Sequence, residues 1–393
     1  MRSLSTRFSG IALLGLCALT VLLTGCASQD EDDSWSVSAP VAAGQAIRLD
    51  TVPSHEPARV YRLTYRSTDA RNAHQLVRVS AQVLVPRGRA PAGGWPVMAW
   101  AHGESGLHLT CAPSVMGIGT VQARFYDGWL RQGFAIVATD YPGLGEPGAP
   151  LQLNARSEGM SVLDAVRAAH ERLPELSETV LLNGHSQGAQ AVLAAAGLAS
   201  SYAPQLHIMG TIAAAPPYLD ETGIQTLLHP RNPHVFSPAV PELLTLGASL
   251  ATADPSFNPS SAFTPRAQKM LQDARTSCSS DFFPLVRRSG LTPATTLQPD
   301  AETALAPALD WTHYPTFTLP APVLIATSGQ DLHTSPAEQK RLTAQLCAAG
   351  TNVTTCYYSS ISHNGTLTAM TSDAHAFAQK LLSGTTPVSE CNR

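Results

Sequence analysis

Ser186 lies in a stretch whose residue types and spacing suit nucleophilic catalysis. Residues 183–189 read NGHSQGA, and the centre of this stretch is the pattern Gly-x-Ser-x-Gly. Gly184 and Gly188 lack side chains, so the chain can reverse sharply there and hold the serine hydroxyl above a sheet. The same pattern also occurs in strand-to-helix turns that have only a structural role. An apolar run before it and an alanine-rich helical pattern after it favour a nucleophile.

Asp331 follows a predicted strand at the place where a catalytic acid is expected. A serine nucleophile needs a base to take its proton and an acid to orient that base. Asp331 stands in SGQDLHTSP, directly after the apolar run 322–327. Asp300 and Asp310 follow no predicted strand. Asp331 is therefore the predicted acid, and the alternative is an aspartate that only forms a turn.

His363 is the predicted base. It stands in SSISHNGT, after the last predicted strand, where a loop of small polar residues can turn an imidazole back toward the serine. The resulting chain order of nucleophile, acid and histidine is a known one. His333 is too close to Asp331 in the sequence to form the third corner, and His375 lies within the last predicted helix. The alternative is an ordinary surface histidine.

Two backbone N–H groups are needed to receive the oxyanion of the reaction. Gln187, directly after the serine and at a helix start, is predicted to supply one through its backbone rather than its side chain. Glu104, in the turn that follows another predicted strand, is predicted to supply the second, with Gly103 as the alternative. The Glu104 carboxylate would oppose an oxyanion unless it points away or is protonated. His185 is predicted to pack beside the nucleophile and not to act as its base.

Strand and helix patterns alternate along most of the chain, which indicates an α/β fold with a mostly parallel sheet covered by helices on both faces. Ser157 is a plausible N-cap of the helix that begins there. The predicted strands are 60–65, 76–85, 97–101, 134–139, 180–183, 208–215, 322–327 and 353–358, and the predicted helices are 122–131, 157–172, 187–199, 337–349 and 372–382.

The alternation stops for about a hundred residues between Pro216 and Pro320, which is too long for a loop. Residues 217–319 are therefore predicted to form a mainly helical cap inserted late in the sheet, and 55–216 with 320–388 to form the core. The apolar residues of the cap are compatible equally with an acyl-binding tunnel and with a small core of its own. They are Phe236, Leu243, Leu244, Leu246, Phe263, Phe282 and Phe283.

The N-terminus has the features of a targeting segment. Arg2 and Arg7 precede an apolar stretch that is short for a membrane span and ends in LTGC. This end resembles the bacterial lipobox, so residues 1–25 are predicted to be a lipoprotein signal peptide and Cys26 to carry lipid. Ala27 after it favours the outer membrane. Residues 26–54, which include an acidic run at 30–33, are predicted to form a flexible tether. The alternative is an ordinary secretory signal with a chance cysteine.

Composition and cysteine usage limit the class of protein. Of all residues 44% are hydrophobic and 14% charged, with a net charge of −4, so the chain is globular and a nucleic-acid partner is not indicated. No oligomeric state is specified. Export makes disulfides expected among the five cysteines beyond Cys26. No Cys-x-x-Cys spacing favours a metal, and neither a metal nor an organic cofactor is required for serine-dependent ester cleavage.

Several motifs in order resemble the secretory lipase family of α/β-hydrolases, of the fungal lipase A type with bacterial relatives. They are AHGESG, CAPS, ATDYPGLGEPG, SEGMSVLDAVRAA, GHSQGA and SGQDLHTSP, followed by His363, and the likeness spans roughly residues 55–385. The resemblance implies Ser186 as nucleophile, Asp331 as acid and His363 as base. It also implies the α/β-hydrolase fold and a large cap. Glu104 departs from the family, where threonine is more usual after His-Gly.

The resemblance also implies a disulfide between Cys111 and the cap residue Cys278. Cys347 and Cys356 form the second expected bridge, and Cys391 can displace either of them. The expected activity is cleavage of acyl esters on small-molecule or lipid substrates, as a lipase or esterase at the cell envelope. A short-chain esterase or acyltransferase, and a lipid-anchored binding protein without catalysis on the same fold, are the alternatives.

Overall fold

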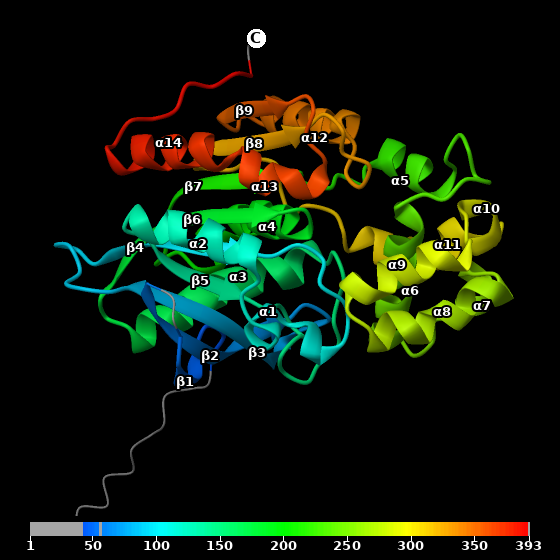
Figure 1. The fold of residues 1–393 in the computed structure, drawn as a ribbon, viewed down its shortest axis with the longest axis horizontal. Coiled ribbons are helices and arrows are strands. Elements are labelled where there is room, and N and C mark those ends of the chain that lie inside the picture. Colours follow the sequence, from blue (N-terminus) through cyan, green and yellow to red (C-terminus); the bar gives the residue numbers. More distant parts are fainter. Residues whose placement is uncertain (1–41, 55–56, 392–393) are drawn as a thin grey trace, which may run out of the picture. The chain divides into compact units, whose positions relative to one another are not determined.

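In the part of the chain that the computed structural model describes, residues 42–54 and 57–391, the strands form a single nine-stranded sheet in the order β1-β2-β3-β5-β4-β6-β7-β8-β9 (Figure 1). The first three strands pair antiparallel, and so does β3 with β5. All later neighbours are parallel. The strands are β1 (Ala46–Val52), β2 (Ala58–Asp69), β3 (Asn72–Pro86), β4 (Trp95–Ala101), β5 (Ala135–Thr139), β6 (Leu176–His185), β7 (His207–Ala214), β8 (Val323–Ser328) and β9 (Val353–Tyr358).

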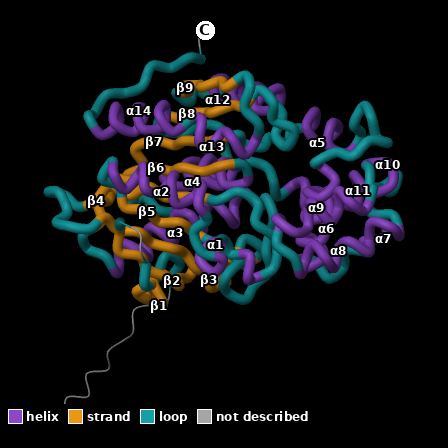
Figure 2. The backbone as a smooth tube through the Cα atoms, viewed as in Figure 1, coloured by secondary structure: helices purple, strands orange, loops and turns teal. Residues whose placement is uncertain are grey.

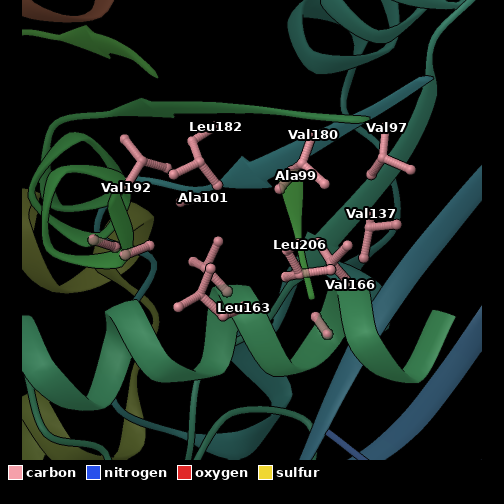
Figure 3. Packing of buried hydrophobic residues seen from close by; sticks show 14 of the residues in the cluster. Val97, Ala99, Ala101, Val137, Leu163, Val166, Val180, Leu182, Val192 and Leu206 are labelled. Atoms are coloured by element: carbon pink, nitrogen blue, oxygen red, sulfur yellow. The ribbon is translucent and has the colours of Figure 1, made fainter. Parts of the chain in front are cut away.

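The central strands are buried on both faces, because successive side chains of a strand point to opposite sides. In β4, Val97, Ala99 and Ala101 belong to one hydrophobic cluster and Met98 and Trp100 to another. Figure 3 shows β4 and β6 side chains packed against helix α3. Because both faces of the sheet are buried, the sequences of these strands are continuous apolar runs and do not alternate between apolar and polar residues.

Helices cover both faces of the sheet. Side chains of α3, α4 and α12 complete the first cluster, and those of α2 and α14 complete the second. The helices around the sheet are α1 (Pro113–Met116), α2 (Thr120–Arg131), α3 (Ala155–Arg172), α4 (Gln187–Tyr202), α12 (Pro336–Ala348), α13 (Thr366–Ala369) and α14 (Thr371–Leu382), with short 3-10 turns η1 (Leu109–Cys111) and η2 (His363–Gly365). The α/β-hydrolase fold expected from the sequence is confirmed.

Between β7 and β8 the chain forms a separate group of helices, here called the helical insertion (residues 217–319). It consists of helices and loops and lies beside the sheet (Figures 1 and 2). Its helices are α5 (Glu221–Leu228), α6 (Ala239–Ala253), α7 (Pro259–Ala262), α8 (Pro265–Thr276), α9 (Ser279–Ser289), α10 (Pro293–Thr296) and α11 (Ala301–Asp310).

The insertion has a hydrophobic core of its own. Leu244, Phe263 and Phe282 are fully buried in it, and the half-buried Phe283 packs against it. Gly247 on α6 permits the close approach of the Phe263 ring, since a Cβ at this position would overlap that ring. Most of the apolar residues that were candidates for an acyl tunnel thus hold the insertion together.

Three local expectations from the sequence are corrected. The tether was expected to continue to residue 54, but Ala46–Val52 forms the edge strand β1, which pairs with β2. Helix α3 begins before Ser157, because the Asn154 side chain accepts the Ser157 N–H and so caps the helix. Cys347 is joined to Cys391 and not to Cys356.

The other disulfide joins Cys111 to Cys278, as the resemblance implied. It links the loop after β4 to the start of α9 in the insertion. The predicted signal peptide, residues 1–25, and the predicted lipidation site Cys26 lie outside the described residues. Within residues 42–54 and 57–391, no helix is long and apolar enough to cross a membrane.

Candidate active site

Ser186 occupies a strained turn between β6 and α4. Its φ is 57° and its ψ −123°, a combination that non-glycine residues seldom adopt and that a sharp strand-to-helix reversal imposes. Its N–H donates to the Ala214 carbonyl of the neighbouring strand at 2.8 Å. A Cβ on Gly184 would overlap the backbone of Gly188, and one on Gly188 would overlap Ala101. Both glycines of the pattern are therefore required by the packing of the turn.

Asp331 and His363 form a hydrogen-bonded pair at the carboxyl ends of β8 and β9. His363 Nδ1 lies 2.8 Å from Asp331 Oδ2, and both residues are buried. The parallel pairing of β6, β7, β8 and β9 brings the loops after these strands to one edge of the sheet. The structure thus gathers the three residues chosen from the sequence at that edge.

The Asp331 carboxylate is held by a set of donors. The backbone N–H groups of His333 and Thr334 each donate to Oδ1 at 2.9 Å, and the Thr334 hydroxyl donates to Oδ2 at 3.1 Å. The Gln339 amide lies 3.3 Å from Oδ2. Burial acts to raise the pKa of Asp331, but the His363 hydrogen bond, the His363 charge and these N–H groups together lower it. The carboxylate is kept ionised and directed at the imidazole.

Thr334 and Gln339 were not found from the sequence. Thr334, three residues after Asp331, fits the local pattern of a side chain that closes a turn, and this spacing is a usable signal. Gln339 lies on α12, and only the packing of that helix against the loop brings its amide to the carboxylate. No sequence pattern indicates that contact.

His185, which was predicted to pack beside the nucleophile and not to act as its base, packs against His363. Its Nε2 lies 3.0 Å from the backbone carbonyl of His363, and the two rings are 4.8 Å apart. Burial and the neighbouring His363 lower the pKa of His185 to about 4. A neutral His185 can donate from Nε2 to that carbonyl, which fixes the loop carrying His363 against β6.

The turn His102-Gly103-Glu104 runs beside the nucleophile. A Cβ built on Gly103 would lie 3.5 Å from the Cβ of Ser186 and 3.4 Å from the His185 carbonyl oxygen. The His102 carbonyl accepts the Tyr141 hydroxyl at 2.8 Å, which holds the turn from below. The backbone of this turn is therefore close enough to Ser186 to contribute to an oxyanion hole.

The Glu104 side chain is engaged by the helical insertion. Ser279, the first residue of α9, donates its hydroxyl to Oε1 at 2.6 Å, while Oε2 is buried without a partner among the described residues. Burial raises the pKa of Glu104 to about 7, although the Ser279 and Gly106 hydrogen bonds act in the opposite direction. The carboxyl group is thus bound to Ser279 and partly protonated at neutral pH, which reduces its conflict with a developing oxyanion.

The side chain of Gln187 is also anchored. Its Nε2 donates to Oε1 of Glu158 on α3 at 2.7 Å, and Glu158 is almost fully buried. Burial raises the pKa of Glu158 well above its ordinary value, which favours the neutral form of this carboxyl group. This contact, which the sequence did not indicate, ties the first residue of α4 to α3.

A cavity of about 220 Å³ lies between the helical insertion and the loop after Asp331. Leu243 and Leu246 of α6 and Leu219 and Leu227 of the α5 region form apolar walls. His333 and Thr334 line the cavity as well, and both contact Asp331. Of the candidate tunnel residues, Leu243 and Leu246 thus face both this cavity and the insertion's core.

Comparison with known proteins places the chain among lipases. The family model described as secretory lipase matches residues 120–390. A lipase A from Moesziomyces aphidis is 32% identical over 186 residues, which cover 43% of this chain and 38% of that protein, so the match spans well under half of the relative's length.

Solved structures share the fold. Candida antarctica lipase A in its closed state has a TM-score of 0.74 at 23% identity and covers 88% of this chain and 84% of its own. The rice cell wall degrading esterase LipA from Xanthomonas oryzae has a TM-score of 0.71 at 17% identity, covering 88% of this chain and all of its own. Since the family model spans more than half of the residues, the chain belongs to the secretory lipase family.

Proposed function

We propose that the protein is a serine hydrolase that cleaves carboxylic esters through an acyl-enzyme, with Ser186 as nucleophile, His363 as base and Asp331 as acid. The observation that carries this proposal is the 2.8 Å pair of Asp331 and His363 at the strand ends next to the Ser186 turn. Membership of the secretory lipase family supports the same reaction class.

The proposed mechanism follows from this arrangement. His363 takes the proton of the Ser186 hydroxyl as the oxygen attacks the ester carbonyl, and Asp331 stabilises the imidazolium that forms. The backbone N–H groups of Gln187 and Glu104 donate hydrogen bonds to the oxyanion. Each of these hydrogen bonds stabilises the transition state by about 3 kcal/mol. The tetrahedral intermediate collapses, the alcohol leaves with the proton from His363, and water then repeats the sequence to release the acid.

The cavity beside His333 and Thr334 supports a medium-length acyl chain. Its volume of about 220 Å³ and its apolar walls suit an acyl chain of limited length. Each methylene removed from water contributes about 0.8 kcal/mol, up to about fourfold in kcat/KM. We propose that the insertion acts as a cap whose apolar wall binds this chain.

This gives a testable chain-length profile. Across p-nitrophenyl esters from acetate to palmitate, kcat/KM is expected to rise to about the octanoate and then to fall, because longer chains exceed the cavity. Ala239→Phe, which adds bulk to the cavity lining, is expected to move the maximum to shorter chains. Ala253→Phe, at the other end of α6 and outside the cavity, is the control. A maximum at acetate, or a rise continuing to palmitate, would contradict the acyl assignment.

We also propose that the protein is exported and held at the cell envelope by lipid on Cys26. The LTGC sequence and the two disulfides support this. Cys26→Ser is expected to move the protein from the membrane fraction to the soluble fraction of an expressing bacterium, because stable anchoring depends on acyl chains. Cys17→Ser, in the apolar stretch before the lipobox, is the control and should leave the protein in the membrane fraction. Retention of Cys26→Ser in that fraction would exclude this anchor.

A further inference from the structure

A second histidine and a carboxylate from the insertion lie next to the proposed base. His333 belongs to the loop between β8 and α12, and Glu242 belongs to α6 of the helical insertion. His333 Nδ1 is 2.7 Å from Glu242 Oε1, and each side chain is 30% exposed. Neither residue is required by the three-residue mechanism above. The contact crosses from the core to the insertion at the edge of the cavity.

His333 touches both members of the acid and base pair. Its ring centroid is 4.9 Å from that of His363, and the two ring planes are tilted by 33°, so the rings are in contact. Its backbone N–H donates to Asp331 Oδ1 at 2.9 Å. Among the described residues no hydrogen bond joins Glu242 to His363 directly, and the His333 ring contacts both of them.

We propose, on the basis of the proposed function, that Glu242 and His333 are a positioning pair for His363: the carboxylate from α6 fixes the His333 ring, and that ring supports the catalytic imidazole in the plane it needs toward Ser186. The insertion then has a second role besides lining the cavity, because the position of α6 on the core determines the orientation of the His363 ring. A substrate that shifts α6 would change the orientation of His363 through the same two side chains.

The charges around His333 give this arrangement a pH signature. The hydrogen bond to Glu242 is the main cause that raises the pKa of His333, with burial opposing it and the charge of Asp331 adding to it. His185 approaches from β6, His363 from η2, Glu338 and Arg341 of α12 line the same cavity, and Glu104 in the turn after β4 faces Glu242. Below the raised pKa of His333 the ring is cationic and paired with the Glu242 carboxylate. Above this pKa the ring is neutral and its contact with Glu242 weakens.

The test uses Glu242→Gln, His333→Asn and the double variant in the full-length protein. We expect the pH profile of kcat/KM for a soluble short-chain ester to change shape in each single variant, because the titration of the Glu242–His333 pair no longer contributes to it. At pH 6 kcat is expected to fall about three- to tenfold, with KM unchanged. The double variant should resemble the single ones, because both changes remove one interaction.

Glu302→Gln is the matched control. It removes the carboxylate of another histidine–glutamate pair in the insertion, His229 with Glu302 at 3.6 Å. Both side chains of this pair are exposed, and among the described residues neither has a hydrogen bond or ion pair with Asp331 or His363. Its pH profile should coincide with that of the unchanged protein. Thermal unfolding of every variant separates a change at the base from a general loss of stability.

Three results would overturn the inference while leaving the esterase assignment intact. They are pH profiles of the single variants that coincide with the unchanged protein, a loss of activity that is uniform across pH and follows lowered thermal stability, and additive effects in the double variant. Failure of the unchanged protein to hydrolyse any ester would instead remove the proposed function, and this inference with it.

Discussion

Replacing Ser186 by alanine is expected to lower kcat for ester hydrolysis by at least about 10⁴-fold. The variant lacks the oxygen that attacks the carbonyl, and residual rate can come only from binding and the oxyanion donors. Alanine fits the turn with the same backbone constraints, so the fold should be retained. Hydrolysis of p-nitrophenyl butyrate, with circular dichroism as a check of folding, measures the effect.

Gln187→Ala is the control for this prediction. It keeps the backbone N–H that the mechanism uses and removes the side-chain hydrogen bond to the buried Glu158. We expect a loss of about tenfold or less, together with some loss of stability. Equal losses in Ser186→Ala and Gln187→Ala would mean that the turn is structural and that the nucleophile lies elsewhere.

Asp331→Asn is expected to lower kcat by about 10⁴-fold at neutral pH, because an amide cannot stabilise the imidazolium and favours the wrong tautomer of His363. The donors to Asp331 from the loop backbone remain, so the geometry should persist. Steady-state kinetics with the same ester measures this. A loss below tenfold would show that another carboxylate serves His363, and Glu242 through His333 is then the first candidate.

The pH dependence of the unchanged protein follows from the same carboxylate. The pKa of Asp331 is lowered in the folded state, so its contribution to stability is present above its unfolded pKa, near 3.9, and is lost as pH falls through the lower folded value. Asp331 therefore remains charged throughout the range in which a histidine base works. Any loss of activity between pH 5 and 7 should therefore not come from protonation of Asp331.

The sequence predicts those residues of the candidate site that directly follow a strand. Ser186, Asp331 and His363 each follow an apolar run, and parallel pairing brings such ends together whatever lies between them. The hundred-residue break in the pattern likewise predicted the helical insertion. Contacts such as that of Gln339 with Asp331 depend on how α12 packs, which no local pattern records.

The pairing of Cys347 with Cys391 and not with Cys356 follows from the sheet faces on which these cysteines lie. Val353 and Cys356 are three residues apart on β9, so their side chains point to opposite faces, and Cys356 packs with the cluster on the α14 side. Cys347 packs with the other cluster. The C-terminal segment returns along β9, where the Glu390 N–H donates to the Val353 carbonyl at 2.8 Å, and this brings Cys391 to Cys347.

The edge strand β1 was missed for a related reason. Residues 46–52 are only partly buried, and polar residues alternate weakly among apolar ones, so their composition resembles that of a tether. Pairing with β2 and the Glu171 carboxylate of α3, which accepts the Ala46 N–H at 2.8 Å, provide the stabilisation. Glu171 lies far away in the sequence, so no local pattern records its contact with β1.

The central claim is that Ser186 is an activated nucleophile, and reaction with a fluorophosphonate followed by mass spectrometry tests it most directly. Such a reagent modifies a serine only when a base and an oxyanion hole activate it. We expect one adduct per chain, located on the peptide that contains Ser186. We expect no adduct in Ser186→Ala, and a rate of labelling reduced to background in His363→Ala. An unmodified protein, or an adduct on another serine, would contradict it.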